Sequence, residues 1–273
     1  MSEMLLERAD RVRRRGPAGR AASGALGVLG VLVLLQAMSL LGIVDRATFP
    51  PVTEDIAALV GEMLTASFWT AVAGTMSGWA IGLGLAILIA VPVGILVGSF
   101  PLAYRAVRVP IEFLRPIPSV ALIPLAVLLF GTGMEFKLFL IVFASIWPIL
   151  IQVLYGVQDV DPVASDTARS FGFGPVARLV RVTLPSALPY AATGLRISAS
   201  IALVLAITAE IVVGAPGVGG AINSAQQGGS YTLMYALILA TGLLGWGVNV
   251  ALELTERRVL RWHVSHRPTG AAL

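Results

Sequence analysis

The sequence predicts an all-α membrane protein with six transmembrane helices and both termini in the cytoplasm. Of its 273 residues, 57% are hydrophobic and only 12% are charged, whereas a soluble domain has about 25% charged residues. Six apolar segments approach or exceed the roughly 20 residues that cross a bilayer core. Arginines gather in alternate gaps between these segments. The composition excludes disorder, and the absence of cysteine excludes a disulfide scaffold.

The apolar segments divide the chain into a basic N-terminus at 1–23, a six-helix domain at 24–254 and a basic tail at 255–273. The third span is short unless its flanks contribute to it. The first follows an arginine-rich stretch, but its 21 residues exceed the apolar part of a signal peptide, so we interpret it as a retained helix. The predicted spans are 24–44, 68–100, 118–130, 138–157, 187–213 and 232–254.

The orientation follows from the basic residues. Sixteen arginines lie in the N-terminus, the gaps 101–117 and 158–186 and the tail, against Arg46 and Lys137 in the alternate gaps. The positive-inside rule therefore places both termini in the cytoplasm of a multi-pass protein of the cell (plasma or inner) membrane. The net charge of +4 then serves to anchor the spans in membrane lipid, and nucleic acid is not an expected partner.

Glycines and prolines in the spans indicate how the helices pack. Small residues four apart let helix backbones approach closely, which favours contacts within the subunit over a pore-side or dimer role. Prolines inside spans predict kinks or broken helices, as expected around an internal path. The glycines are Gly74, Gly78, Gly82, Gly94 and Gly98, and the prolines are Pro92, Pro124 and Pro148.

Two ionisable residues, Arg196 and Glu210, lie clearly within the predicted spans. A charge inside a membrane is a functional candidate, so both are candidates for the translocation path or its gating. Alternatively, Arg196 snorkels or pairs with backbone or loops, and Glu210 anchors the outer end of its helix. Fourteen residues, or about 21 Å of helix, separate them, so they cannot pair directly.

The gap 158–186 is predicted to form two short helices. Asp161 suits the N-cap position with Pro162 after it, and Gly172 suits the stop after Phe171. A second helix then starts after Gly174 and ends at Pro185. Such an exposed pair either docks in another protein's groove or is an ordinary surface loop.

The same loop resembles the EAA loop of ABC-importer permeases, whose pattern is Glu-Ala-Ala, three residues, Gly, nine residues and Ile-x-Leu-Pro. Both spacings match here, with Asp for Glu, Thr for the first Ala and Val for Ile. The resemblance identifies this segment as the loop that couples to an ATPase. The residues concerned are Asp166, Thr167, Ala168, Phe171, Gly172, Val182, Leu184 and Pro185.

Other motifs resemble the nitrate/sulfonate/taurine branch of these permeases over about 68–246. By this resemblance Arg196 and Glu210 look like parts of the family scaffold more than solute ligands. The last motif has Val where the family usually has Leu. The motifs are Arg115-Pro116-Ile117-Pro118, Ala121-Leu122-Ile123-Pro124-Leu125, Phe130-Gly131-Thr132-Gly133, Leu188-Pro189, Thr193-Gly194-Leu195-Arg196, Ala209-Glu210 and Gly217-Val218-Gly219.

The resemblance implies a type I ABC-importer permease that works as a homodimer, with a heterodimer left open. Two cytoplasmic ABC ATPase subunits would bind ATP and Mg, and an extracytoplasmic substrate-binding protein would deliver the solute. The expected solute is a small anion such as a sulfonate, taurine or nitrate. A heterocyclic vitamin precursor or another small organic solute is the alternative.

The sequence offers no catalytic residues, no cofactor site and no metal site of its own. No Gly-x-x-x-x-Gly-Lys-Ser/Thr loop is present, so ATP hydrolysis belongs to another subunit. His263 and His266 lie in the basic tail, which argues against a membrane-embedded enzyme. A stand-alone secondary transporter would show inverted repeats, which we do not find. Copurification of an ATPase distinguishes it from an importer subunit.

Overall fold

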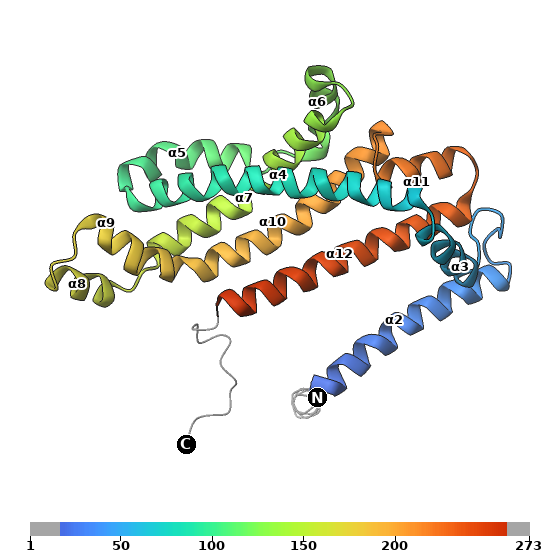
Figure 1. Ribbon diagram of the computed structural model, residues 1–273, viewed down its shortest axis with the longest axis horizontal. Coiled ribbons are helices and arrows are strands. Elements are labelled where there is room, and N and C mark those ends of the chain that lie inside the picture. Colours follow the sequence, from blue (N-terminus) through green and yellow to red (C-terminus); the bar gives the residue numbers. More distant parts are fainter. Residues whose placement is uncertain (1–16, 261–273) are drawn as a thin grey trace, which may run out of the picture.

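The computed structural model describes residues 17–260, and every regular element in that range is a helix. Figure 1 shows long helices running side by side, with shorter ones at both ends of the bundle. In chain order they are α2 (Pro17–Leu40), α3 (Val52–Met63), α4 (Ala66–Ser99), α5 (Pro101–Leu114), η1 (Ser119–Leu122), α6 (Ile123–Phe130), α7 (Met134–Gln158), α8 (Pro162–Ser170), α9 (Pro175–Arg178), η2 (Leu179–Thr183), α10 (Leu184–Val213), α11 (Val218–Gln227) and α12 (Tyr231–Val259).

Four helical stretches within the described residues are long and apolar enough to cross a membrane. They are α4, α7, the stretch from α9 through α11, and α12. A fifth is added if α5 and the short helices after it, bent by 81°, count as one span. The apolar part of α2, Leu26–Leu40, is shorter. The basic ends predicted at 1–23 and 255–273 lie largely outside the described residues.

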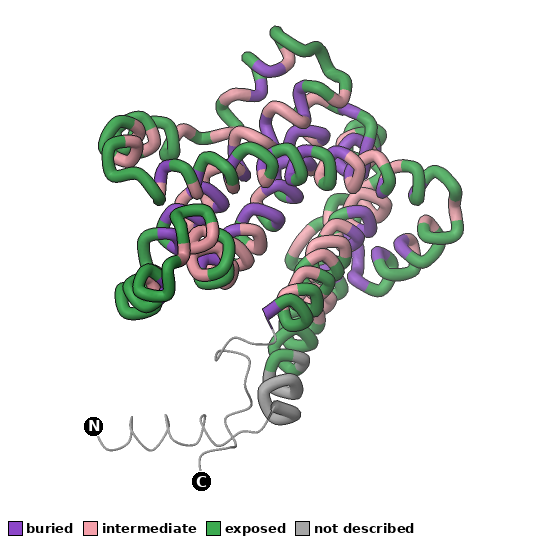
Figure 2. Tube along the Cα trace, turned by 60° about the vertical axis from the view of Figure 1, so that its left-hand side comes forward, coloured by how far each residue is buried: buried purple, intermediate pink, exposed green. Residues whose placement is uncertain are grey.

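Helix α7 forms the centre of the bundle, between α4 and α10 (Figure 1). The largest core cluster joins Ala86 and Ala90 of α4 to Ile149 and Val153 of α7 and Ala199 of α10. In Figure 2 the buried residues follow these central helices, while exposed residues dominate the periphery. Small residues of α4 and α10 thus allow both helices to pack closely on α7.

Four of the five predicted glycines of α4 pack against α7, and Gly74 packs against Pro216 and Gly217, which confirms the predicted role in subunit packing. A Cβ added to Gly82 would lie 2.6 Å from Ile141, and one added to Gly94 would lie 2.9 Å from Val153. Gly98 faces Val157 in the same way. Each glycine precedes its neighbour by 59 residues, so α4 and α7 run in the same direction.

Two parallel helices need a return segment between them, and the predicted third span at 118–130 corresponds to η1 and α6, which form with α5 a pair bent by 81°. Helix α5 turns back beside α4, and α6 then projects away from the side of the bundle (Figure 1). Pro116 and Pro118 separate the two parts, because the residue before a proline disfavours helical backbone. The return is therefore a bent pair rather than one helix.

The three span prolines lie in different helical contexts. Pro92 and Pro148 lie inside helices that continue past them, so neither breaks its span. Pro124 instead lies in the first turn of α6, where a proline's missing N–H costs nothing. The gaps before the second and sixth spans contain α3 and α11.

Candidate functional site

The loop at residues 158–186, which we call the knob, forms its first helix as predicted. The Asp161 carboxylate accepts a hydrogen bond from the Val163 N–H at 2.8 Å, which caps the start of α8. At the other end the Gly172 and Phe173 N–H groups donate to the carbonyls of Arg169 and Ala168, both at 3.0 Å. This pairing is a Schellman stop, and it requires the left-handed φ of +78° that Gly172 adopts.

The knob exposes apolar side chains at its tip. Phe171 is 78% exposed and Val176 is 74% exposed, while Ala168 faces inward and is buried. Asp166 and Arg169 form an exposed ion pair at 3.5 Å beside them, which adds little stability. Exposed apolar groups ringed by charge are typical of a docking surface.

The expectation that Pro185 ends the second helix is wrong. Helices α9 and α10 are joined by the five-residue π turn η2, and the chain remains helical from Pro175 to Val213. Pro185 has no N–H to donate to an earlier carbonyl, and it lies in the first turn of α10, directly after η2. A π turn is a recognised way to absorb such a defect. The knob is therefore continuous with a membrane-spanning helix.

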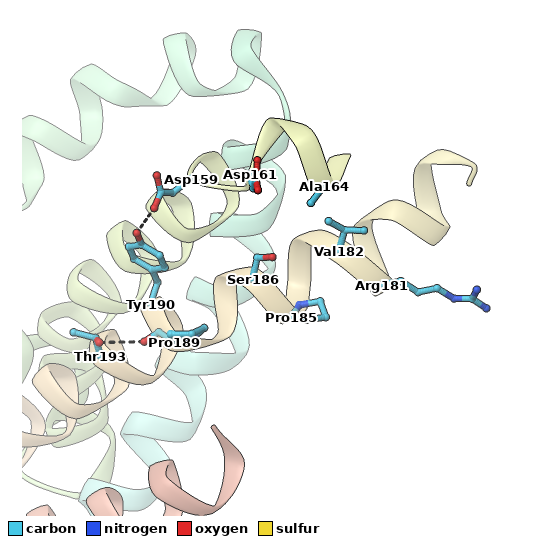
Figure 3. Close-up of a pocket in the computed structure, with 10 residues that line it drawn as sticks. All are labelled: Asp159, Asp161, Ala164, Arg181, Val182, Pro185, Ser186, Pro189, Tyr190 and Thr193. Atoms are coloured by element: carbon cyan, nitrogen blue, oxygen red, sulfur yellow. Dashed lines mark hydrogen bonds between the residues drawn. The ribbon is translucent and has the colours of Figure 1, made fainter. Parts of the chain in front are cut away.

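Hollows flank the knob on two sides. The first, of about 810 Å³, lies between α8 and the start of α10, and Figure 3 shows the residues around it. Tyr190 donates a hydrogen bond to Asp159 at its edge, while Arg181 extends outward and lies 5.3 Å from the centre of the Phe173 ring. The second, of about 1020 Å³, lies between the knob and the end of α4, and Asp166 lines it.

The predicted coupling residues therefore all lie in the knob, either at its tip or at its junction with α10. Val182 and Pro185 line the first hollow, and Thr167 and Phe171 are exposed at the tip. Leu184 begins α10 and is half-buried. Together with Asp166, Ala168 and Gly172, they surround the junction between α8 and α10.

Glu210 is not a helix-end anchor but the centre of a buried polar cluster. Its carboxylate accepts hydrogen bonds from Lys137 Nζ at 2.5 Å, Thr75 Oγ1 at 2.8 Å and the Gly219 N–H at 3.0 Å. Lys137 also donates to the carbonyls of Pro216 at 3.2 Å and Gly74 at 3.5 Å. We call Thr75, Lys137, Glu210 and the Gly217–Gly219 turn the polar hub.

The hub joins four helices, α4, α7, α10 and α11. Thr75 also accepts a hydrogen bond from the Val218 N–H at 2.9 Å, so the start of α11 is bound to α4 as well. A Cβ on Gly217 would lie 2.2 Å from the Glu210 carboxyl carbon. Because Gly217 and Gly219 have no side chains, the Gly217-Val218-Gly219 motif leaves space for the Glu210 carboxylate.

Sequence reasoning missed Lys137, which it assigned to an outer gap, although the side chain is 3% exposed. Lys137 is the chain's single lysine and is followed by a long apolar run. This apolar context is the one feature of the sequence that could have indicated a buried lysine. Arg196 is bonded to Glu256 of α12. The two candidate path residues thus each have a partner on another helix, and the structure does not bring them together. Among the described residues, no His, Asp and Glu side chains are grouped so as to hold a metal ion.

Comparison with known proteins assigns the fold and the family. The profile of the family described as the inner membrane component of binding-protein-dependent transport systems matches residues 90–261. The chain belongs to this family. It is the permease component of an ABC importer, in a branch with taurine, sulfonate and nitrate permeases, and a multi-pass protein of the inner membrane.

Three relatives illustrate the branch. The permease is 29% identical to the taurine transport system permease protein TauC of Escherichia coli over 83% of this chain and 84% of that protein. It is 30% identical to the putative aliphatic sulfonates transport permease protein SsuC of Bacillus subtilis, over 85% of this chain and 84% of that protein. The nitrate import permease protein NrtB of Leptolyngbya laminosa is 28% identical to the permease, over 71% of this chain and 69% of that protein.

A solved structure shares the fold of the permease. The inward-facing MetNI methionine ABC transporter has a chain that superposes with a TM-score of 0.62 at 21% identity. The match covers 72% of the permease and 98% of that chain. The permease thus shares the overall fold of a solved importer chain.

Proposed function

We propose that two copies of this permease and two cytoplasmic ABC ATPase subunits import a small anion that an external binding protein delivers. The knob carries the proposal, because it presents exposed Phe171 and Val176 between two hollows. A partner that covers these apolar side chains would remove them from water. ATP and Mg would be bound by that partner, and hydrolysis would take place there.

The continuity of α9, η2 and α10 provides the coupling mechanism. A partner that moves the knob also moves the start of α10, which packs along α7 in the centre of the bundle. Nucleotide binding would then shift the population between inward-open and outward-open states. Such a shift requires the partner to bind the knob more tightly in one state than in the other.

We propose six spans with cytoplasmic termini, in which α2 is the first and the bent pair of α5 and α6 is the third. The parallel course of α4 and α7 supports this, because the chain has to cross between them. The whole domain at 24–254 then forms one unit, with the basic segments 1–23 and 255–273 on the inner side. Reporters fused at Arg108 and Gly228 are expected to read cytoplasmic and external, respectively.

The coupling role is tested with Gly172→Asp. The added Cβ has open space around it, so the change acts through the left-handed backbone that Gly172 requires. A strain of about 1 kcal/mol or more at the stop of α8, with a new charge on the docking face, should weaken ATPase copurification at least about fivefold. Membrane insertion should remain normal, because no span uses this position.

Gly229→Asp is the matched control, since Gly229 has a φ of +69° and equally open surroundings at the opposite end of the bundle. It should leave copurification and uptake unchanged. Full ATPase binding and full uptake by Gly172→Asp would show that the knob is an ordinary linker. A permease that transports without any ATPase would instead support a secondary transporter.

The proposed solute class rests on the taurine, sulfonate and nitrate relatives. The direct test is uptake of taurine, ethanesulfonate and nitrate by vesicles holding the complex and its binding protein. Uptake of a heterocyclic vitamin precursor, with none of the three anions transported, would favour the alternative solute class.

A further inference from the structure

A pocket of about 380 Å³ between α7, α10 and the start of η1 is not part of the knob or the polar hub. Its volume is within the range of about 300–1,000 Å³ that small-molecule sites have. Four residues with polar side chains line it: Arg115, Ser119, Trp147 and Gln152. The rest of the lining is apolar and includes Ile151, Ile197 and Ile201.

The pocket lies near the middle of the bundle's height. Trp147 is thirteen residues from the start of α7 and eleven from its end. Ile197 is thirteen residues into the thirty of α10. Arg115, which the sequence placed in a cytoplasmic gap, reaches this level because the fourteen residues of α5 carry the chain back by about 21 Å.

Two polar groups of the pocket, the Arg115 guanidinium and the Trp147 indole N–H, have no partner among the described residues. The Trp147 indole Nε1 is buried without a hydrogen bond. Within the described part of the chain, the Arg115 side chain makes no hydrogen bond or ion pair, whereas Arg108, in the helix that Arg115 follows, is paired with Glu112 at 2.8 Å. Arg115 is an exposed residue, so its guanidinium is open to a solute, whereas the buried Trp147 N–H is costly to leave without an acceptor. Together they lack a negatively charged acceptor.

The pocket also has a neighbour on the cytoplasmic side. Arg115 and Ile151 line a second hollow of about 430 Å³, which extends along α5 to Tyr104 near the cytoplasmic end of that helix. A solute held beside Arg115 therefore has a neighbouring hollow toward the cell interior. The apolar lining suits an alkyl group, while the four polar groups suit an oxyanion.

Resting on the proposed import function, we propose that this pocket is a transient binding site for a small oxyanion within the permease. The Arg115 guanidinium supplies the positive charge, and the Trp147 N–H, Ser119 hydroxyl and Gln152 amide donate hydrogen bonds. The oxygen atoms of a sulfonate or nitrate accept from planar guanidinium donors in a fixed geometry. Arg115 is thus a specificity-determining residue of the permease itself.

The test uses the full complex in vesicles, with saturating binding protein loaded with taurine, ethanesulfonate or nitrate. Arg115→Gln should lower the anion imported per ATP hydrolysed at least about tenfold, as loss of a hydrogen-bonded charge pair does. Binding-protein-stimulated hydrolysis should change less than about twofold, since the knob is untouched. A residue that only supports the fold would lower both rates together.

Two conservative variants and one control sharpen the test. Arg115→Lys should import more anion per ATP hydrolysed than Arg115→Gln but less than the wild type, because lysine keeps the positive charge without the planar guanidinium. Trp147→Phe removes the N–H and keeps most of the ring, and should lower the ratio by a few fold. Arg105→Gln, an exposed arginine on the same helix that lines neither hollow, should have no effect.

Several outcomes would overturn the proposal. One is an unchanged ratio in both Arg115→Gln and Trp147→Phe while the wild-type complex imports the anion. Another is an effect confined to vesicles that contain phosphatidylglycerol and absent in pure phosphatidylcholine, which would assign Arg115 to a lipid headgroup. If Arg115→Gln does not assemble, Trp147→Phe alone decides. Failure of the wild type to import any of the anions would contradict the proposed function instead.

Discussion

The two ends of the permease use charged residues in opposite ways. In the knob, Asp166 and Arg169 form an ion pair on the surface, and most of α8 is exposed. In the polar hub, Lys137 and Glu210 are paired inside the protein, and Glu210 has no exposed surface. The knob contributes little to the core, while the hub fixes four helices to one another.

This difference indicates which end can move and which cannot. A segment with few buried contacts opens at low cost, whereas a fully satisfied buried network resists deformation. The knob is therefore suited to follow the proposed partner, and it is continuous with α10. The hub is suited to hold the ends of α4, α7, α10 and α11 that lie opposite the knob as a fixed frame. Changes at the two ends should consequently have different effects.

The largest effect is expected for Lys137→Met, which leaves the Glu210 carboxylate buried without its cation. Breaking a buried pair from one side costs about 3–5 kcal/mol, so the yield and melting temperature of the purified permease should fall sharply. The double variant Lys137→Met with Glu210→Gln should recover part of the loss. Wild-type stability of the single variant would show that the hub is not a fixed frame.

Two alanine substitutions compare the ends directly. Gly217 has a φ of +149° and a Cβ there would contact Glu210 at 2.2 Å, whereas Gly172 has a φ of +78° and open surroundings. Gly217→Ala should therefore destabilise the permease by more than about 2 kcal/mol, because both strain and overpacking act. Gly172→Ala should cost about 1 kcal/mol. Equal melting temperatures would contradict the contrast between the hub and the knob.

Asp55 extends the comparison to pH. It lies in α3, at the end of the bundle opposite the knob (Figure 1). Burial, and then the neighbouring Glu54 charge, raise the pKa of Asp55 from 3.8 to about 6. The folded state then holds a proton that the unfolded chain has released, so the free energy of unfolding should fall as pH rises from about 4 to 6. The size of the change should be about 1–3 kcal/mol.

Asp55→Asn should remove this pH dependence and stabilise the protein above pH 6. Glu54→Gln should shift the window only slightly, because the Glu54 charge is the lesser cause. Denaturation of the detergent-solubilised permease between pH 4 and 7 provides the measurement. A stability that rises through this range in the wild type, and equally in Asp55→Asn, would show that Asp55 ionises normally.

The smallest effect is expected for Arg196→Gln, midway between the two ends. Arg196 is partly exposed and its partner Glu256 lies on α12, so the loss should be about 1 kcal/mol or less. The amount of assembled complex should decline slightly, with unchanged apparent affinity for the solute. Glu256→Gln should lower stability by a similar amount. The double variant should lose no more stability than either single variant, because both changes remove the same ion pair. Altered solute affinity with normal assembly would make Arg196 a path residue.

Much of the knob was determined by the local sequence. The Asp161 cap, the Pro162 start and the Gly172 stop all act within about four residues of the helix ends they control, so they were visible without any tertiary information. The glycine spacing of α4 likewise predicted a closely packed helix face. The apolar composition and the distribution of arginines were enough to indicate a membrane protein.

Only the tertiary structure decided the rest. Lys137 meets Glu210 across 73 residues of sequence, and no local pattern shows that a lysine at an apparent loop edge is buried. Pro185 does not end its helix, because a π turn absorbs the defect while packing on α7 holds the chain helical. Arg115 reaches the middle of the bundle only because α5 turns back. Local hydrogen bonds fix helix ends, whereas long-range packing decides where charges lie in the membrane.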